Sequence, residues 1–144
     1  VGIWLVDQWR QIGLNVKIET IEASAYHPML KRGDFDVAMD FQCGFIVEPD
    51  LDLARFISTS DANYGKHKDK MIDELYQKQA RAGDIEDRKK IIRQLEKRLL
   101  DEETHVIYTL QWHRIIPHNS KVHGWTITPS HYLNNMLDTV WLSE

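Results

Sequence analysis

The segment KMIDELYQKQARAGDIEDRKKIIRQLEKRLLDE, residues 70–102, contains the two clearest helical patterns of the chain. In its first half, apolar side chains recur every three or four positions and form one stripe, which consists of Met71, Ile72, Leu75, Tyr76 and Ala80. Gly83 interrupts this pattern, and Asp84 followed by Asp87 resembles a capping box that opens a second helix over residues 85–102. The spacing predicts two amphipathic helices joined by a short turn.

The second predicted helix carries a charged face opposite its apolar one. Its inward positions are Ile91, Ile92, Leu95 and Leu99. On the other side Glu86 can pair with Lys90, and Arg98 with Glu102, because side chains four positions apart are neighbours on a helix. We expect this face to be exposed to solvent. The alternative is that it binds a partner protein, which would make the chain a self-standing α/β interaction module.

The first residues of the chain already follow a helical pattern. Leu5, Trp9 and Ile12 share one face, and Gly13 is a natural C-terminal stop. Because the sequence has no starting Met and begins within this pattern, we expect it to be a fragment of a longer protein. Any targeting segment would then lie upstream.

Residues 15–22 and 35–41 are predicted to be the two strands of a βαβ unit. NVKIETIE alternates between apolar and polar side chains, and FDVAMDF contains the apolar run of a strand covered on both faces. Between them, Ser24 can cap a short helix that has Pro28 in its first turn and ends at Gly33. Strands joined in this way lie parallel, with a right-handed crossover.

Further along, residues 51–58 are predicted to form a short helix and residues 104–112 a strand. Residues 140–142 form a last strand, whose partner we expect to lie outside the chain. The sequence shows no repeat, linker or domain boundary. The predicted fold is therefore a single α/β lobe over residues 1–144, with a mixed sheet that contains the parallel βαβ unit and has helices on its flanks.

Composition excludes some classes of function. The chain has 144 residues, of which 42% are hydrophobic and 28% charged, and these values are typical of a soluble globular protein. Its net charge is −4 and its basic residues form no stripe, which argues against nucleic acid as a partner. A single cysteine, Cys43, rules out an internal disulfide and a cysteine-based zinc site.

The sequence gives little support for catalysis or metal binding. The five histidines of the last third form no HxH or HExxH motif; they are His105, His113, His118, His123 and His131. The acids of residues 34–52 lack the spacing of a calcium loop, and no phosphate-binding glycine loop occurs. An enzyme using Cys43, or a metal bound by His113 and His118, is the remaining alternative. We expect no catalysis, no cofactor and no metal.

The order of several short motifs resembles the C-terminal part of the family 5 extracellular solute-binding proteins, the peptide and nickel receptors of ABC importers. The resemblance covers nearly the whole chain. Its motifs are WRQIGLNVKIE (residues 9–19), LKRGDFDVAM (30–39), EPD (48–50), NYGKHKDK and the two helices after it (63–102), and NSKVHGW (119–125). It implies one lobe of a fold like the type II periplasmic binding proteins.

The resemblance also implies where a ligand binds. Residues 35–41 would run toward a cleft, and residues 42–48 would form its wall. In peptide-binding relatives the backbone of this wall pairs with the extended ligand, and Gln42 and Cys43 match positions along that ladder. Phe45 stands where relatives carry the aspartate that neutralises the peptide's ammonium group. A peptide with a free N-terminus is therefore less expected than a modified peptide or another amphiphilic solute.

We therefore predict a ligand-binding site without catalytic or metal-binding residues. Asp40 or Glu48 would be the substitute for the missing aspartate, and Trp112 ends the late strand. The candidate ligand-binding residues are Asp40, Phe41, Gln42, Cys43, Gly44, Phe45 and Trp112. The implied partners are a small-molecule or peptide ligand, the permease subunits of an ABC importer and an N-terminal lobe of the same protein. The implied location is the periplasm, or the outer face of a single-membrane cell.

Overall fold

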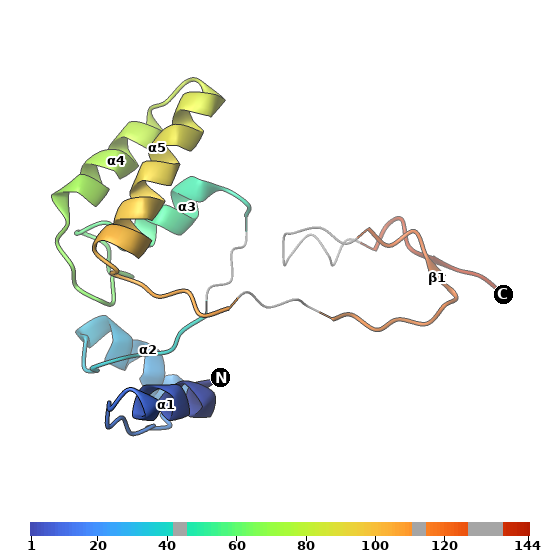
Figure 1. The fold of residues 1–144 in the computed structure, drawn as a ribbon. Helices are drawn as coiled ribbons and strands as arrows, with labels where there is room; N and C mark the ends of the chain where they lie inside the picture. The colour runs from blue at the N-terminus through green and yellow to red at the C-terminus, as the bar shows by residue number, and fades with distance from the viewer. Residues whose placement is uncertain (42–45, 111–114, 127–136) are drawn as a thin grey trace. The chain divides into compact units, whose positions relative to one another are not determined.

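The computed structural model describes residues 1–41, 46–110, 115–126 and 137–144, and its regular structure is mainly helical (Figure 1). The chain divides into two compact units, residues 1–41 and residues 42–144, and each is considered by itself below. The first unit contains α1 (Gly2–Gln11) and α2 (Ala23–Arg32). The elements of the second are α3 (Pro49–Leu53), the 3-10 turn η1 (Ala54–Phe56), α4 (Lys70–Ala80), α5 (Ile85–Lys97), the π-helical turn η2 (Arg98–Glu102), β1 (Val122–His123) and β2 (Trp141–Leu142).

In the first unit, α2 is bounded by residues that suit a helix end. The carboxylate of Glu22 accepts a hydrogen bond from the amide of Ser24, so Glu22 is the N-cap and the prediction of Ser24 as the cap is wrong. Pro28 lies inside the helix rather than in its first turn, which removes one backbone hydrogen bond. Gly33 ends the helix with a φ of 78°, as its lack of a side chain allows.

The second unit is built on an antiparallel pair of helices, α4 and α5. Asp69 caps α4 by accepting hydrogen bonds from the amides of Met71 and Ile72, and Asp84 caps α5 in the same way. The two helices and the short turn between them confirm the helices predicted over residues 70–102, but Met71 and Ala80, which were predicted to share the apolar stripe, are exposed. The predicted second helix corresponds to α5 and the π-helical turn η2 that continues it, in which the backbone hydrogen bonds join residues five positions apart.

The apolar stripes of this pair meet a third layer formed by α3 and η1. The core cluster consists of Leu53, Phe56, Ile72, Leu75, Leu95 and Leu99, all buried. Ile72 and Leu95 are 0% exposed. Side chains of α3 and η1 thus complete a core that two amphipathic helices alone would leave open on one side.

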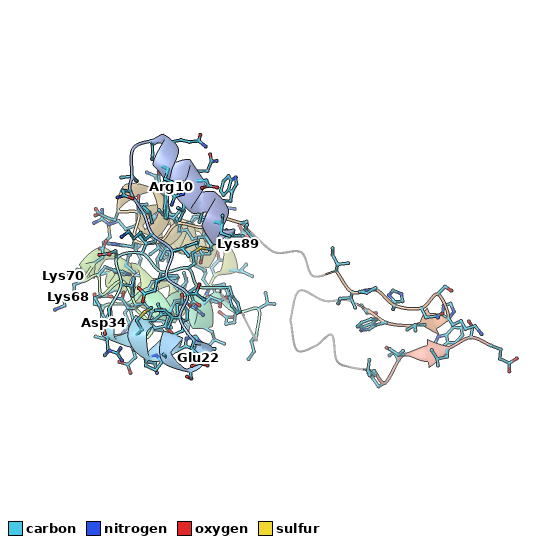
Figure 2. The ribbon with its side chains drawn as sticks, turned by 90° about the horizontal axis from the view of Figure 1, so that it is seen from below. Arg10, Glu22, Asp34, Lys68, Lys70 and Lys89 are labelled. Atoms are coloured by element: carbon cyan, nitrogen blue, oxygen red, sulfur yellow. The ribbon has the colours of Figure 1, made fainter. Side chains whose placement is uncertain are left out.

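The outward face of α5 carries ion pairs along the helix. Glu86 pairs with Lys89 and Asp87 with Lys90, each at 2.7 Å, whereas the sequence suggested a pair between Glu86 and Lys90. The predicted contact between Arg98 and Glu102 is present at 3.5 Å. Exposed pairs of this kind contribute roughly 0–1 kcal/mol each. Figure 2 shows Lys89 among the charged side chains of the surface.

The predicted α/β lobe with a parallel βαβ unit is wrong. Within the described residues the only ladder is antiparallel, with Val122 opposite Leu142 and His123 opposite Trp141. Residues 14–22, 35–41 and 104–110 form no strand. Many of their apolar side chains remain open to solvent; Ile18 is 52% exposed and Val37 67% exposed, whereas Val106 packs against the core. Alternation of apolar and polar side chains favours a strand, but a strand forms only where it pairs by backbone hydrogen bonds with a neighbouring segment of chain.

The last predicted strand does form, over Trp141–Leu142, but its partner lies within the chain rather than outside it. Gly124, next to β1, has a φ of 74°, and a Cβ there would lie 2.1 Å from the carbonyl oxygen of Thr139. Glycine is therefore required for this close approach. No helix in the described part of the chain is long and apolar enough to cross a membrane.

The fully buried position of Leu95 gives a test of this core. Leu95→Ala is expected to lower the free energy of unfolding by about 2–5 kcal/mol, because it leaves a cavity where α3 meets the helix pair. Ile85→Ala is the matched control on the same helix, since Ile85 is 66% exposed, and should change stability by less than about 0.5 kcal/mol. Urea denaturation followed by circular dichroism measures both. Equal effects would contradict the assigned core.

Candidate functional site

A groove of about 330 Å³ lies beside the start of α3 in the second unit. Its floor is apolar and is formed by Leu53, Phe56, Ile92, Leu99 and Leu100. Its rim combines apolar and polar side chains from four segments: Val47, Glu48, Pro49, Asp52, Glu96 and Tyr108. This volume is at the lower end of the range of roughly 300–1,000 Å³ that is typical of small-molecule sites.

The sequence around Pro49 fixes one edge of the groove. Pro49 is the first residue of α3, where its missing N–H costs no intrahelical bond and its fixed φ suits the helix. Glu48 is the N-cap, and its carboxylate accepts a hydrogen bond from the amide of Asp50 at 3.2 Å. The acid-Pro-Asp motif is therefore a helix start, and it presents Val47, Glu48 and Pro49 to the groove.

A polar network centred on Gln79 holds this edge against the helix pair. Gln79 belongs to α4 and is 0% exposed. Its Nε2 donates a hydrogen bond to Oδ1 of Asp50 at 2.5 Å, and its Oε1 accepts one from Nε of Arg88 at 3.1 Å. Nη2 of Arg88 also donates to Oε1 of Glu48. The four side chains of this network link α3, α4 and α5; we call them the Gln79 network.

The charges of the Gln79 network stabilise one another. The hydrogen bond from Arg88, followed by the one from the amide of Asp50, lowers the pKa of Glu48. Burial raises the pKa of Tyr76, and the neighbouring carboxylate of Asp50 adds to this rise. Glu48 is therefore ionised and paired with Arg88, so its charge is already compensated within the protein.

Tyr108 also lines the groove. Burial raises the pKa of its hydroxyl group. Arg55 lowers this pKa, while the carboxylates of Asp52 and Glu96 raise it. Both carboxylates therefore act on the same place, the polar end of the Tyr108 ring, although one belongs to α3 and the other to α5.

A second polar cluster lies where α4 begins and η2 ends. Besides capping α4, Asp69 accepts a hydrogen bond from Nε of Arg98 at 2.8 Å, and its Oδ2 lies 3.3 Å from Nε2 of His105. The ring of His105 stacks on that of His67, with centroids 4.0 Å apart and an interplanar angle of 9°. Figure 2 labels Lys68 and Lys70, the exposed residues that flank Asp69 in the chain.

This cluster favours the uncharged form of His67. Both ring nitrogens of His67 are buried and have no hydrogen-bond partner among the described residues. Burial lowers the pKa of His67, and the neighbouring His105 lowers it further, against the smaller opposing effects of Asp69 and Asp73. Burial works to raise the pKa of Asp69, but its hydrogen bonds outweigh this and leave that pKa lowered.

The described residues do not assemble a metal centre. No group of three or more histidine, cysteine, aspartate or glutamate side chains is placed to hold a metal within them. Of the histidines proposed for the metal alternative, His118 is described and its Nδ1 lies 3.5 Å from the carbonyl oxygen of Ile116. His113 and Cys43 lie outside the described residues, so the structure does not test their proposed roles.

The structure describes only part of the predicted ligand-binding set. Asp40 and Phe41 are exposed members of the first unit. The other predicted residues lie outside the described residues; they are Gln42, Cys43, Gly44, Phe45 and Trp112. Those five assignments remain predictions. Of the predicted wall, residues 42–48, the described end does line the groove, through Val47 and Glu48.

Sequence reasoning missed Gln79, Arg88 and Tyr108 as residues that shape the site. One signal was present for Gln79. It follows Ile72 and Leu75 at helical spacing, so it occupies an apolar position of α4, and a polar side chain buried there needs hydrogen-bond partners. No local signal indicates that the partners are Asp50 and Arg88, because the fold brings these residues together.

Comparisons with known proteins found no relative of this chain. No protein-family model, curated protein or solved structure matches the chain.

Gln79→Leu tests the role of the network. The substitution keeps the side chain's approximate size but leaves Asp50 and Arg88 without their shared partner, so we expect the free energy of unfolding to fall by about 1–3 kcal/mol. Gln77→Leu, at an exposed position of the same helix, is the matched control and should have little effect. Chemical denaturation measures both variants. A neutral Gln79→Leu would show that the network does not hold α3.

The His67 pKa predicts how stability depends on pH. Because the folded state lowers this pKa below its ordinary value of 6.5, the unfolded state binds more protons as the pH falls through that value. Stability is therefore fully present above about pH 6.5 and is lost progressively below it, down to the folded-state pKa.

His67→Phe keeps an aromatic ring against His105 but cannot titrate. The variant should lose less stability than the parent chain between about pH 7.5 and pH 5.5, measured by urea denaturation at each pH. His27→Phe, which alters an exposed histidine, should leave the pH dependence of the parent chain unchanged. An identical pH dependence in the parent chain and in His67→Phe would contradict the assigned burial.

Proposed function

We propose that this chain is a ligand-binding part of a solute-binding receptor that captures a small amphiphilic solute, such as a modified peptide, and delivers it to the permease of an ABC importer. The receptor would act in the periplasm, or at the outer face of a single-membrane cell. The order of motifs from WRQIGLNVKIE to NSKVHGW supports this proposal. In the proposed function the chain binds the solute and does not convert it chemically.

The groove beside Val47, Glu48 and Pro49 is the observation that carries the proposal. Val47 and Glu48, which line it, belong to the segment that the resemblance implies as the ligand-binding wall. An apolar floor with a polar rim suits a ligand that has a hydrocarbon part and a polar end. The Gln79 network holds the edge of the groove in place, and a preorganised site loses less entropy when a ligand binds.

The manner of binding differs from the one that the resemblance implies. A peptide added as a strand needs a free sheet edge, and residues 35–41 form no strand. Contacts with the ligand would instead come from the side chains of α3, η1, α5, η2 and Tyr108. The proposal therefore depends on the groove and on the order of motifs, and not on a lobe containing a parallel sheet.

Leu100→Asp tests whether the groove binds amphiphiles. Hexyl glucoside serves as a neutral amphiphilic probe, and the shifts of backbone amide signals during an NMR titration report its binding and its location. We expect weak binding, with a dissociation constant of about 1 mM, since only one side of the receptor's site is present. The largest shifts should occur at Ile92, Leu100 and Tyr108. Leu100→Asp should weaken binding at least about tenfold, because it places a charge in the apolar floor.

Leu51→Asp is the matched control. Leu51 is an apolar residue of α3 that is 56% exposed and does not line the groove, whereas Leu100 lines it and is 38% exposed. The control should bind hexyl glucoside as the parent chain does. Shifts scattered over the surface, or equal losses in the two variants, would contradict binding in the groove.

A further inference from the structure

The lining of the groove contains acidic side chains but no basic ones. Glu48, Asp52 and Glu96 are part of it, and no lysine, arginine or histidine belongs to the lining that the structure describes. Arg88 neutralises Glu48 through their ion pair. Asp52 and Glu96 have no hydrogen-bond or ion-pair partner for their carboxylates within the described residues. Two carboxylates without an ion-pair partner among the described residues therefore remain in the lining of an apolar groove.

The carboxylates of Asp52 and Glu96 both act on the hydroxyl group of Tyr108. Asp52 comes from α3 and Glu96 from α5, so the charges are supplied by two elements that border the groove. Both raise the pKa of the Tyr108 hydroxyl, so both carboxylates lie close enough to this end of the groove to act on a group placed there. Arg55 acts on Tyr108 in the opposite sense, but it does not line the groove.

We propose that the groove selects organic cations, with the ammonium group of the ligand held between Asp52 and Glu96 beside the Tyr108 ring and its hydrocarbon part on Leu53, Ile92 and Leu99. This inference rests on the proposed function, because it names the class of solute that the same groove takes.

Each part of such a ligand meets a surface that favours it. The carboxylates attract the cation, and the face of an aromatic ring adds a further attraction for an ammonium group. The apolar part is removed from water on the leucine and isoleucine side chains. An anion of the same shape would bring a third negative charge to this end of the groove, and that repulsion opposes its binding. The charge of the solute, rather than its tail, therefore sets the preference.

The test compares three probes that share one hexyl tail: hexyltrimethylammonium, hexyl sulfate and the neutral hexyl glucoside. Amide shifts in an NMR titration of the chain at low salt give the three dissociation constants. The cation should bind about tenfold more tightly than the sulfate, which is the effect that two exposed charge contacts of ordinary strength produce. The preference should shrink at high salt, because these charges are open to solvent.

A double variant, Asp52→Asn with Glu96→Gln, identifies the source of the preference. It should bring the affinities for cation and sulfate to within about threefold of each other and leave the neutral probe unaffected. The matched control, Glu74→Gln with Asp101→Asn, removes the same charge from exposed positions outside the groove and should keep the preference.

The outcomes separate this inference from the proposal on which it rests. If hexyl glucoside binds in the groove but the cation binds no better than the sulfate, the inference fails and the proposed function stands. A preference that survives in the Asp52 and Glu96 variant overturns the inference as well. If none of the three probes shifts the signals of the groove, both fail.

Discussion

The buried amide of Gln79 is the constraint on which the second unit depends. A side chain that is 0% exposed must satisfy both ends of its amide within the protein, because an unpaired buried polar group costs roughly 1–3 kcal/mol. Here one end donates to Asp50 and the other accepts from Arg88. Apolar packing between α3 and the helix pair is not directional and would allow α3 to slide. The hydrogen bonds of Gln79 are directional and favour the position of α3 in which Asp50 meets the amide, and this position sets the edge of the groove.

Asp69 holds in place the segment that carries Tyr108, another part of the groove's lining. It starts α4 as an N-cap, and through Arg98 and His105 it also holds the chain that leaves η2. The segment fixed in this way leads to Tyr108, three residues after His105. Two acidic residues, each at or near the start of a helix, therefore help to position the lining of the groove: Asp50 through Gln79, and Asp69 through Arg98 and His105. The apolar floor is supplied by side chains of α3, η1, α5 and η2.

Local sequence signals predicted the helices well and the sheet badly. The stripes of residues 70–102, the cap at Asp84 and the stop at Gly33 are properties of neighbouring residues, so the sequence contains all the information they need. A strand depends on a distant partner, and alternation over residues 15–22 could not provide one. The same limit applies to the site. Glu48 and Pro49 were visible as part of a motif, but Arg88 and Tyr108 reach the groove only through tertiary packing.

The most direct test of this account is whether α3 rests on the helix pair in solution. Nuclear Overhauser contacts between side chains, measured on the chain with labelled Leu and Phe, report this arrangement. The account predicts contacts that join Leu53 or Phe56 to Leu95 or Leu99. If α4 and α5 form their own contacts while Leu53 and Phe56 show none to α5 or η2, then α3 is not seated there. The groove, and the binding inferred from it, would lose its structural basis.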